Sequence, residues 1–176
     1  VEANFGEGNF GGSRARVCPG SEYEKTRFYF TLLVKNEAGW RNLCVLSSKA
    51  SIEGQYYKPR IDHDLMAEHA EGIVCLSGCA GSEISEAIRA EDFAKAKELA
   101  LWYKSVYGDD FYLELQDHGH PDAPNHWDVQ KIINDGLMKL SKELNIPMIV
   151  SCDSHYLTHE DQDAHEILLC VGTGSY

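Results

Sequence analysis

An Asp-x-His pair lies near the end of the chain, in the stretch MIVSCDSH at residues 148–155. The apolar run at its start predicts a buried strand, and Asp153 and His155 follow directly after that strand. Residues two apart on an extended segment point to the same side, so both side chains are placed to meet one metal ion. The alternative is ordinary loop chemistry, in which Asp153 forms an Asx turn and His155 donates to a backbone carbonyl. Spacing alone leaves both interpretations open.

Two other predicted strands are also followed by side chains that bind metals. Cys79 comes after the run at 73–76, and Asp117 with His118 comes after the run at 111–115. Sites in α/β proteins form where the carboxyl ends of parallel strands meet. A mixed set of imidazole, carboxylate and thiolate suits zinc, iron or manganese. The alternative for Cys79 is a packed thiol. The alternative for His118 is a solvent-facing loop residue, and the remaining histidines are expected in loops, at helix ends or on surfaces: His63, His69, His120, His126, His159 and His165.

Several other kinds of site are excluded by their missing motifs. The chain contains no G-x-S-x-G nucleophile elbow, no Walker A sequence and no G-x-G-x-x-G. The glycines of VGTGSY follow a predicted helix rather than a strand, which argues against a dinucleotide site. Metal-dependent chemistry therefore remains the main candidate.

Four short apolar strands alternate with amphipathic helices along the chain. We expect the strands at 28–34, 73–76, 111–115 and 148–151. The helices are expected over 37–50, after the caps Asp62, Ser82 and Asp92, from Asn125, and after the Thr158 capping box. This order predicts an α/β fold with a mostly parallel sheet covered by helices. Four strands are too few for a closed eightfold barrel, so part of a barrel is expected.

The helical periodicity also predicts which faces are buried. For the first helix it predicts a buried stripe of Trp40, Leu43, Cys44 and Ser47. For the last helix it predicts a stripe of Ala164, Ile167, Leu168 and Val171. Residues 1–26, rich in Gly, Asn, Ser, Arg and Glu, predict a poorly ordered loop segment before the domain proper at 27–176.

Composition narrows the class of protein further. The 176 residues suit one domain or a large piece of a bigger protein, and the net charge of −12 repels phosphate backbones. Six cysteines without a CxxC pair argue against a structural zinc knot and favour a reducing, cytoplasmic compartment. No apolar run reaches the roughly 20 residues of a membrane span. The chain begins with Val1 and shows no signal peptide, which suggests that upstream sequence was removed.

Four stretches together resemble one known family. They are FTLLVKNEAGWRNLCVLSSKASIEGQYYKPRID, GIVCLSGCAGSEI, DDFYLELQDHG and IPMIVSCDSHYLTHEDQDAHEILLCVGTG. From about Arg27 to Gly174 they resemble the polymerase-and-histidinol-phosphatase (PHP) domain, in the version found at the N-terminus of bacterial replicative DNA polymerase III alpha subunits. The resemblance implies part of a distorted (β/α)7 barrel with a metal cluster at the C-terminal ends of its strands.

The resemblance also implies a set of ligand positions. Asp153 and His155 match the late Asp-x-His, Cys79 matches the His-or-Cys position, and Glu2 is similar to the Glu of a Gly-x-Glu motif. Tyr29 stands where the family has a mid-chain His, and a phenol is a poor ligand at neutral pH. The early His-x-His is not in this chain, which implies an N-terminally truncated fragment. The set of ligands is therefore incomplete.

The resemblance implies a role in DNA replication. The parent would be a DNA-directed DNA polymerase, a nucleotidyltransferase that uses Mg²⁺ in a palm domain absent from these residues. The fragment itself is expected to be inactive, with a structural or vestigial metal-binding role, and zinc, manganese or iron would belong to a complete PHP site. Its expected partners are the rest of the alpha subunit and other replisome subunits, with DNA bound through the parent and no membrane contact. The alternatives are an active metal-dependent 3′–5′ exonuclease or phosphoesterase site in the full protein, or a stand-alone histidinol-phosphatase-like enzyme.

Overall fold

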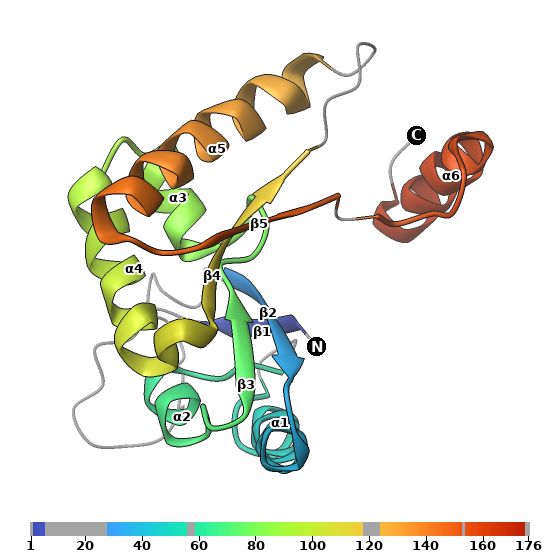
Figure 1. The fold of residues 1–176 in the computed structure, drawn as a ribbon. Helices are drawn as coiled ribbons and strands as arrows, with labels where there is room; N and C mark the ends of the chain where they lie inside the picture. The colour runs from blue at the N-terminus through green and yellow to red at the C-terminus, as the bar shows by residue number, and fades with distance from the viewer. Residues whose placement is uncertain (1, 6–27, 56–58, 118–123, 153, 175–176) are drawn as a thin grey trace, which may run out of the picture.

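A five-stranded sheet forms the centre of the computed structural model of this chain, which describes residues 2–5, 28–55, 59–117, 124–152 and 154–174. The strands are β1 (Glu2–Phe5), β2 (Phe28–Val34), β3 (Ile73–Leu76), β4 (Phe111–Gln116) and β5 (Met148–Ser151). Their order in space follows their order in the chain, β1-β2-β3-β4-β5 (Figure 1). β3, β4 and β5 are parallel, whereas β1 with β2 and β2 with β3 are antiparallel.

In the described part of the chain, six α-helices accompany the sheet: α1 (Glu37–Ile52), α2 (His63–Glu68), α3 (Glu83–Arg89), α4 (Phe93–Tyr107), α5 (Pro124–Leu144) and α6 (Gln162–Thr173). Polar side chains cap the first four helices, because each accepts a hydrogen bond from a backbone N–H three residues on, as predicted for Asn36, Asp62, Ser82 and Asp92. The α/β class, the four expected strands and these helix starts are confirmed.

The N-terminal part of the sheet differs from the expectation. Residues 1–26 were expected to be loop, but Glu2–Phe5 form β1 and pair with β2 in antiparallel register, Asn4 opposite Tyr29. Residues 6–27 lie outside the described part of the chain. β2 also runs antiparallel to β3, to which it is connected through α1 and α2. This reversal places the start of β2, rather than its end, beside the carboxyl end of β3.

Helices α3, α4 and α5 cover one face of the parallel strands (Figure 1). The largest side chains of this layer are aromatic: the ring centroid of Tyr103 in α4 lies 4.8 Å from that of Phe30 and 5.3 Å from that of Phe111. All three side chains are buried, together with Leu113 and Ile133. The burial of these large apolar surfaces is the main stabilising contribution to the fold.

The buried face of α1 is set by a close approach between two glycines. A Cβ placed on Gly39 would lie 1.8 Å from the carbonyl oxygen of Gly72, and Gly72 itself has a φ of +73°. Since Gly39 must face the backbone of Gly72, just before β3, the buried face of the helix consists of Gly39, Leu43, Leu46 and Ala50. The predicted stripe was therefore wrong in part: Trp40 is 59% exposed and Cys44 is exposed, while Leu43 is buried.

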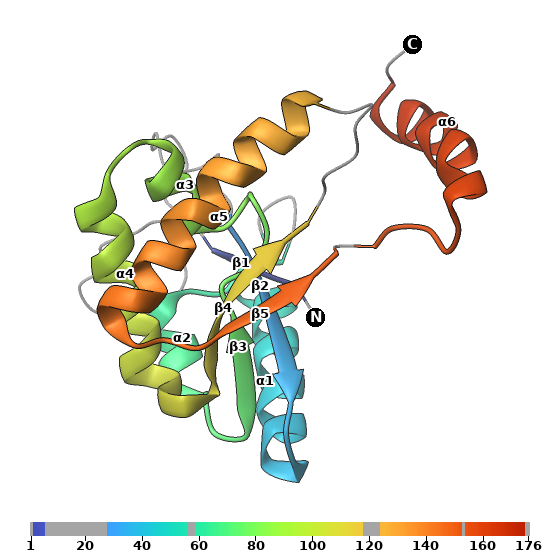
Figure 2. The same ribbon diagram turned by 45° about the horizontal axis from the view of Figure 1, so that its top comes forward.

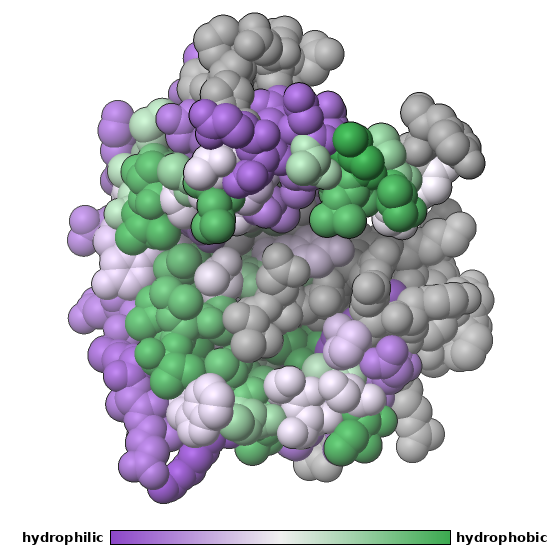
Figure 3. All heavy atoms as spheres, turned by 90° about the vertical axis from the view of Figure 1, so that its right-hand side faces the viewer, coloured by the Kyte–Doolittle hydropathy of each residue, from purple (hydrophilic) through white to green (hydrophobic). Residues whose placement is uncertain are grey.

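The last helix, α6, lies apart from α1–α5 in both ribbon views (Figures 1 and 2). Its predicted apolar stripe exists but is not buried, because the exposed fractions of Ile167, Leu168 and Val171 are 66%, 68% and 76%. The helix begins later than expected: Thr158 donates from its backbone N–H and its hydroxyl to Asp161, and a 3-10 turn at His159–Asp161 precedes α6. Hydrophobic side chains accordingly face the viewer at the level of α6 in Figure 3.

Among the described residues, no helix combines the length and the apolar character that a bilayer span requires.

Candidate functional site

The carboxyl ends of β3, β4 and β5 share one edge of the sheet. Their register aligns Gln116 with Ser151, so β4 and β5 end side by side and Asp117 and Cys152 follow them at the same level. The last residue of β3, Leu76, is aligned with Tyr112 near the start of β4, so β3 ends earlier, and the chain continues beside β4 through the hydrogen bond from Ser77 N–H to the Tyr112 carbonyl oxygen. Because β2 is antiparallel to β3, its first residues reach the same edge. The expectation that ligand side chains from the strand ends meet at one place stays a prediction, and the start of β2, rather than its end, lies beside the end of β3.

Tyr29 and Cys79 are brought together around a glycine-rich turn. The backbone N–H of Tyr29 donates to the carbonyl oxygen of Gly81 at 3.2 Å, and the N–H of Gly81 donates to Cys79 Sγ at 3.4 Å. A Cβ on Gly81 would lie 3.0 Å from the Tyr29 ring and 3.7 Å from Cys79 Sγ. Gly78, with a φ of +80°, allows this turn to touch the backbone of Tyr29. Tyr29, which stands where the family resemblance implies a His, thus lies beside Cys79, the predicted thiol ligand.

The other three predicted ligands are described less completely. Asp153 lies outside the described residues, and Glu2 is described only as a backbone position opposite Thr31 in β2. His155 is exposed, and its ring centroid lies 5.8 Å from that of His165. His165, expected on a helix surface, is a partly exposed residue of α6 whose ring lies near those of His155 and Tyr156.

The donor set gives a partial answer on metal binding. A thiol, an imidazole and carboxylates are the mixed ligands expected for zinc, manganese or iron. Within the described part of the chain, no three His, Cys, Asp or Glu side chains are arranged to hold a metal ion. The structure therefore brings Cys79 next to Tyr29 without assembling a set of ligands in the described residues, and a phenol does not replace an imidazole as a ligand at neutral pH.

A buried carboxylate lies just below this edge, and sequence reasoning missed it. Glu114 in β4 is 6% exposed, and its Oε1 accepts hydrogen bonds from Ser151 Oγ at 2.6 Å and from Gln116 Nε2 at 3.4 Å. Its backbone N–H donates to Ser77 Oγ at 2.9 Å. Its second oxygen, Oε2, is buried and has no hydrogen-bond partner among the described residues. The FYLEL pattern offers no signal for this, since a strand with one Glu normally places it in solvent.

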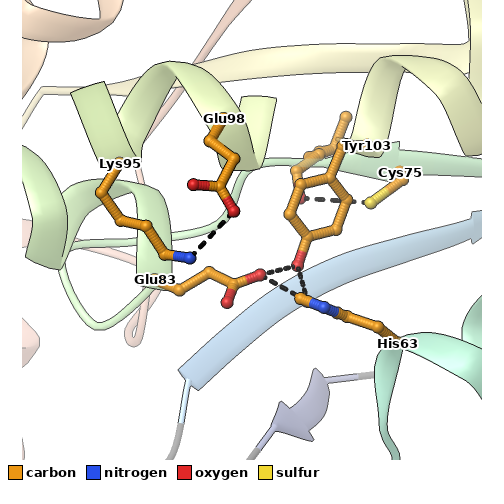
Figure 4. A network of polar contacts seen from close by, with 7 residues as sticks. His63, Cys75, Glu83, Lys95, Glu98 and Tyr103 are labelled. Carbon is orange, nitrogen blue, oxygen red and sulfur yellow. Dashed lines mark hydrogen bonds and ion pairs between the residues drawn. The ribbon is translucent and has the colours of Figure 1, made fainter. Parts of the chain in front are cut away.

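A second polar network connects the helices on the covered face of the sheet (Figure 4). Oε1 of Glu83, which is 4% exposed, lies 2.7 Å from Nε2 of His63 and also accepts a hydrogen bond from the Tyr103 hydroxyl. The His63 ring stacks on Trp102 with centroids 4.0 Å apart. His63 was expected at one end of a short helix, and it is the first residue of α2, where it also joins α2 to α3 and α4.

Burial governs the acid–base behaviour of the groups around Glu83. Burial raises the pKa of the Tyr103 hydroxyl well above its ordinary value, and the negative charge of Glu83 raises it further. The Cys75 thiol in β3 is fully buried, and burial followed by the charges of Glu83 and Glu114 raises its pKa well above the ordinary value. Both groups therefore stay protonated, and the network holds the helices together rather than offering a nucleophile.

Comparison with known proteins gives one family and a consistent set of relatives. The family model described as "PHP domain" matches residues 10–118. The chain is 45% identical over 151 residues to a DNA polymerase III subunit alpha of Borreliella burgdorferi, which covers 86% of this chain and 13% of that protein. It is 42% identical over 164 residues to the subunit of Deinococcus radiodurans (92% and 12%) and 42% identical over 170 residues to that of Treponema pallidum (92% and 14%). The chain thus spans about an eighth of the length of these relatives.

Proposed function

Because this chain belongs to the PHP domain family, we propose that it is the PHP part of a DNA polymerase III alpha subunit, a DNA-directed DNA polymerase of DNA replication. The observation that carries the proposal is identity of 42–45% to such subunits across 86–92% of this chain. A stand-alone phosphatase would not need to resemble polymerases over that length. The proposed partners are the rest of the subunit and the replisome, in the cytoplasm.

The proposed role of these residues is structural, with a reduced metal site. Tyr29 beside Cys79 supports a reduced site, because an imidazole position of the family carries a phenol. When bound, zinc, manganese or iron would supply a Lewis acid and an activated water. The residues Cys79, His155, Asp153 and Glu2 would hold it. DNA contact is assigned to other parts of the subunit, since a net charge of −12 repels the phosphate backbone.

The alternative is an active 3′–5′ exonuclease or phosphoesterase at the same edge. Cys79 favours it, because its Sγ lies at the carboxyl end of β3, where the family places its metal cluster. A stand-alone histidinol-phosphatase-like enzyme is the third possibility, and it predicts phosphate release without primer extension.

The complete open reading frame that contains residues 1–176 decides among these functions. The purified protein should extend a primed template with Mg²⁺, and the double variant Cys79→Ser, His155→Ala should extend it at the wild-type rate. We expect the wild-type protein to show no metal-dependent removal of 3′ nucleotides beyond any that the double variant also shows. Nuclease activity lost in the double variant would establish the exonuclease alternative. Hydrolysis of histidinol phosphate without primer extension would refute the polymerase assignment.

A further inference from the structure

The last helix, α6, carries an apolar stripe that no described residue covers. The stripe consists of Ile167, Leu168 and Val171, all of them exposed, and the helix lies apart from the other five in both ribbon views (Figures 1 and 2). Its only extensive contact among the described elements is with the 3-10 turn directly before it. A helix of 12 residues is marginally stable in water without tertiary packing. The α6 stripe therefore needs a surface to pack against.

The strand that precedes α6 has an uncovered apolar surface of its own. In the register of β4 and β5, Met148 lies beside Leu113. Neighbours in register point to the same face of a sheet, so Met148 and, two residues on, Val150 point to the face that α3, α4 and α5 cover. Ser151 alternates to the opposite face, where it donates to Glu114.

The cover provided by those three helices ends at β4. Leu113 of β4 is fully buried beneath them, whereas Met148 of β5 is 41% and Val150 71% exposed. Val150 has the largest exposed fraction among the large hydrophobic side chains of the described strands. Parallel strands are normally covered by helices on both faces, so the helix side of β5 is a place where one more helix fits.

Chain length and tethering favour α6 of the same molecule as that helix. The link at residues 152–158, before the 3-10 turn, reaches up to roughly 23 Å when extended, whereas α6 is about 18 Å long. The link is therefore long enough for α6 to fold back along β5. A short tether also gives α6 an effective concentration in the millimolar range at its own β5, and a second copy of the protein in dilute solution does not reach that concentration.

We propose that α6 closes onto β5 of its own chain in the complete protein, so that the α6 stripe covers Met148 and Val150. This contact goes beyond the proposed function, because it concerns neither the polymerase reaction nor a metal ligand. Its consequence is local order at the sheet edge. His155 lies between β5 and α6, and the closed helix holds the segment that carries it at both ends, where Asp117 and Cys152 follow β4 and β5.

Hydrogen exchange in the protein made from the complete open reading frame, followed by mass spectrometry, tests the contact. We expect the backbone amides of α6 to exchange slowly in the wild type. Val150→Asp places a charge under the helix and should speed their exchange about tenfold or more. Leu168→Asp, on the facing surface, should speed exchange in α6 by a similar factor. Ile52→Asp, at an 81% exposed residue of α1, is the matched control and should leave α6 unchanged.

A milder variant and a dilution series make the outcome decisive. Val150→Thr keeps the shape of the side chain, and it should speed exchange in α6 by a smaller factor even if Val150→Asp does not fold. Fast exchange of α6 in the wild type would overturn the proposal. So would slow exchange that Leu168→Asp abolishes and both Val150 variants leave intact, because another part of the protein would then cover α6. Protection that weakens on dilution would assign the contact to a second copy and would overturn it as well.

Discussion

Nε2 of His63 lies 2.7 Å from Oε1 of Glu83, although 20 residues separate them in the chain. Glu83 is the first residue of α3 and His63 the first residue of α2, so the contact joins the starts of two helices. Tyr103 of α4 donates to the same oxygen (Figure 4). Three helices therefore depend on one buried carboxylate.

Replacing that carboxylate should lower stability. In Glu83→Gln the amide group cannot accept both hydrogen bonds as strongly, and a buried donor loses its charged partner. We expect the free energy of unfolding to fall by about 1–3 kcal/mol, measured by urea denaturation at pH 7. Glu98→Gln, at a side chain that is 71% exposed, is the control and should leave the urea midpoint unchanged. Equal midpoints for the two variants would show that the network contributes nothing.

Alkaline pH should destabilise the fold through the buried hydroxyls and thiol. Burial raises the pKa of Tyr103, Tyr107 and Cys75 above the values they have in the unfolded chain. The unfolded state therefore loses protons first as pH rises, from about pH 8.5 upward, while the folded state keeps them. Their contribution to stability is complete below that pH and is lost as pH rises above it. Urea unfolding at a series of pH values from neutral to strongly alkaline measures this slope.

The variant Tyr107→Phe measures the contribution of one hydroxyl to this dependence of stability on pH. The Tyr107 hydroxyl is buried and has no hydrogen-bond partner among the described residues, so its removal should cost little at pH 7. Above about pH 10 the variant should lose stability less steeply than wild type. A slope identical to wild type would contradict the assignment of the pKa shift to burial of this residue.

Gly39→Ala should be far more harmful than an alanine in a helix usually is. The new Cβ would lie 1.8 Å from the Gly72 carbonyl oxygen, so α1 must move away from the sheet. We expect a loss of about 1–3 kcal/mol, seen as a lower melting temperature. In Gly172→Ala of α6 the Cβ meets nothing within 4 Å, and the better helix former should leave stability unchanged or slightly higher. Similar melting temperatures for both variants would refute the close approach.

Tyr29→His should restore a ligand beside Cys79. If the edge is a reduced metal site, the full-length variant should bind zinc or manganese ~10-fold or more tightly than wild type, as measured by metal titration after chelation. Tyr112→His, at the second residue of β4, is the matched control and should bind as wild type does. Equal affinities of Tyr29→His and wild type would argue that the corner at Cys79 is not a metal site.

Local sequence patterns predicted most element boundaries, because caps and apolar runs are local signals. β2 and β3 begin and end at the predicted residues, and Asp62 and Ser82 cap the helices expected there. The buried face of α1 could not be derived in this way. It depends on the contact between Gly39 and Gly72, and those residues meet only after the chain has folded.

The site was predictable only in part. Cys79 could be singled out because it follows a strand in a recognisable motif, and Tyr29 because the family resemblance implies a ligand there; their role in a site stays a prediction. Glu114 was missed, because its burial is created by the neighbouring strands rather than by its own sequence context. His63 was missed because its partner Glu83 belongs to a different helix.

The strand order also has a consequence for synthesis on the ribosome. In the described sheet, each strand after β1 pairs with the strand that precedes it in the chain. Each pair can therefore form as soon as its second strand has been synthesised. N-terminal elements fold first during translation, at about 5–20 residues per second. The outer edge of β4 is consequently unpaired for a few seconds, until α5 and β5 have emerged and β5 has paired with it.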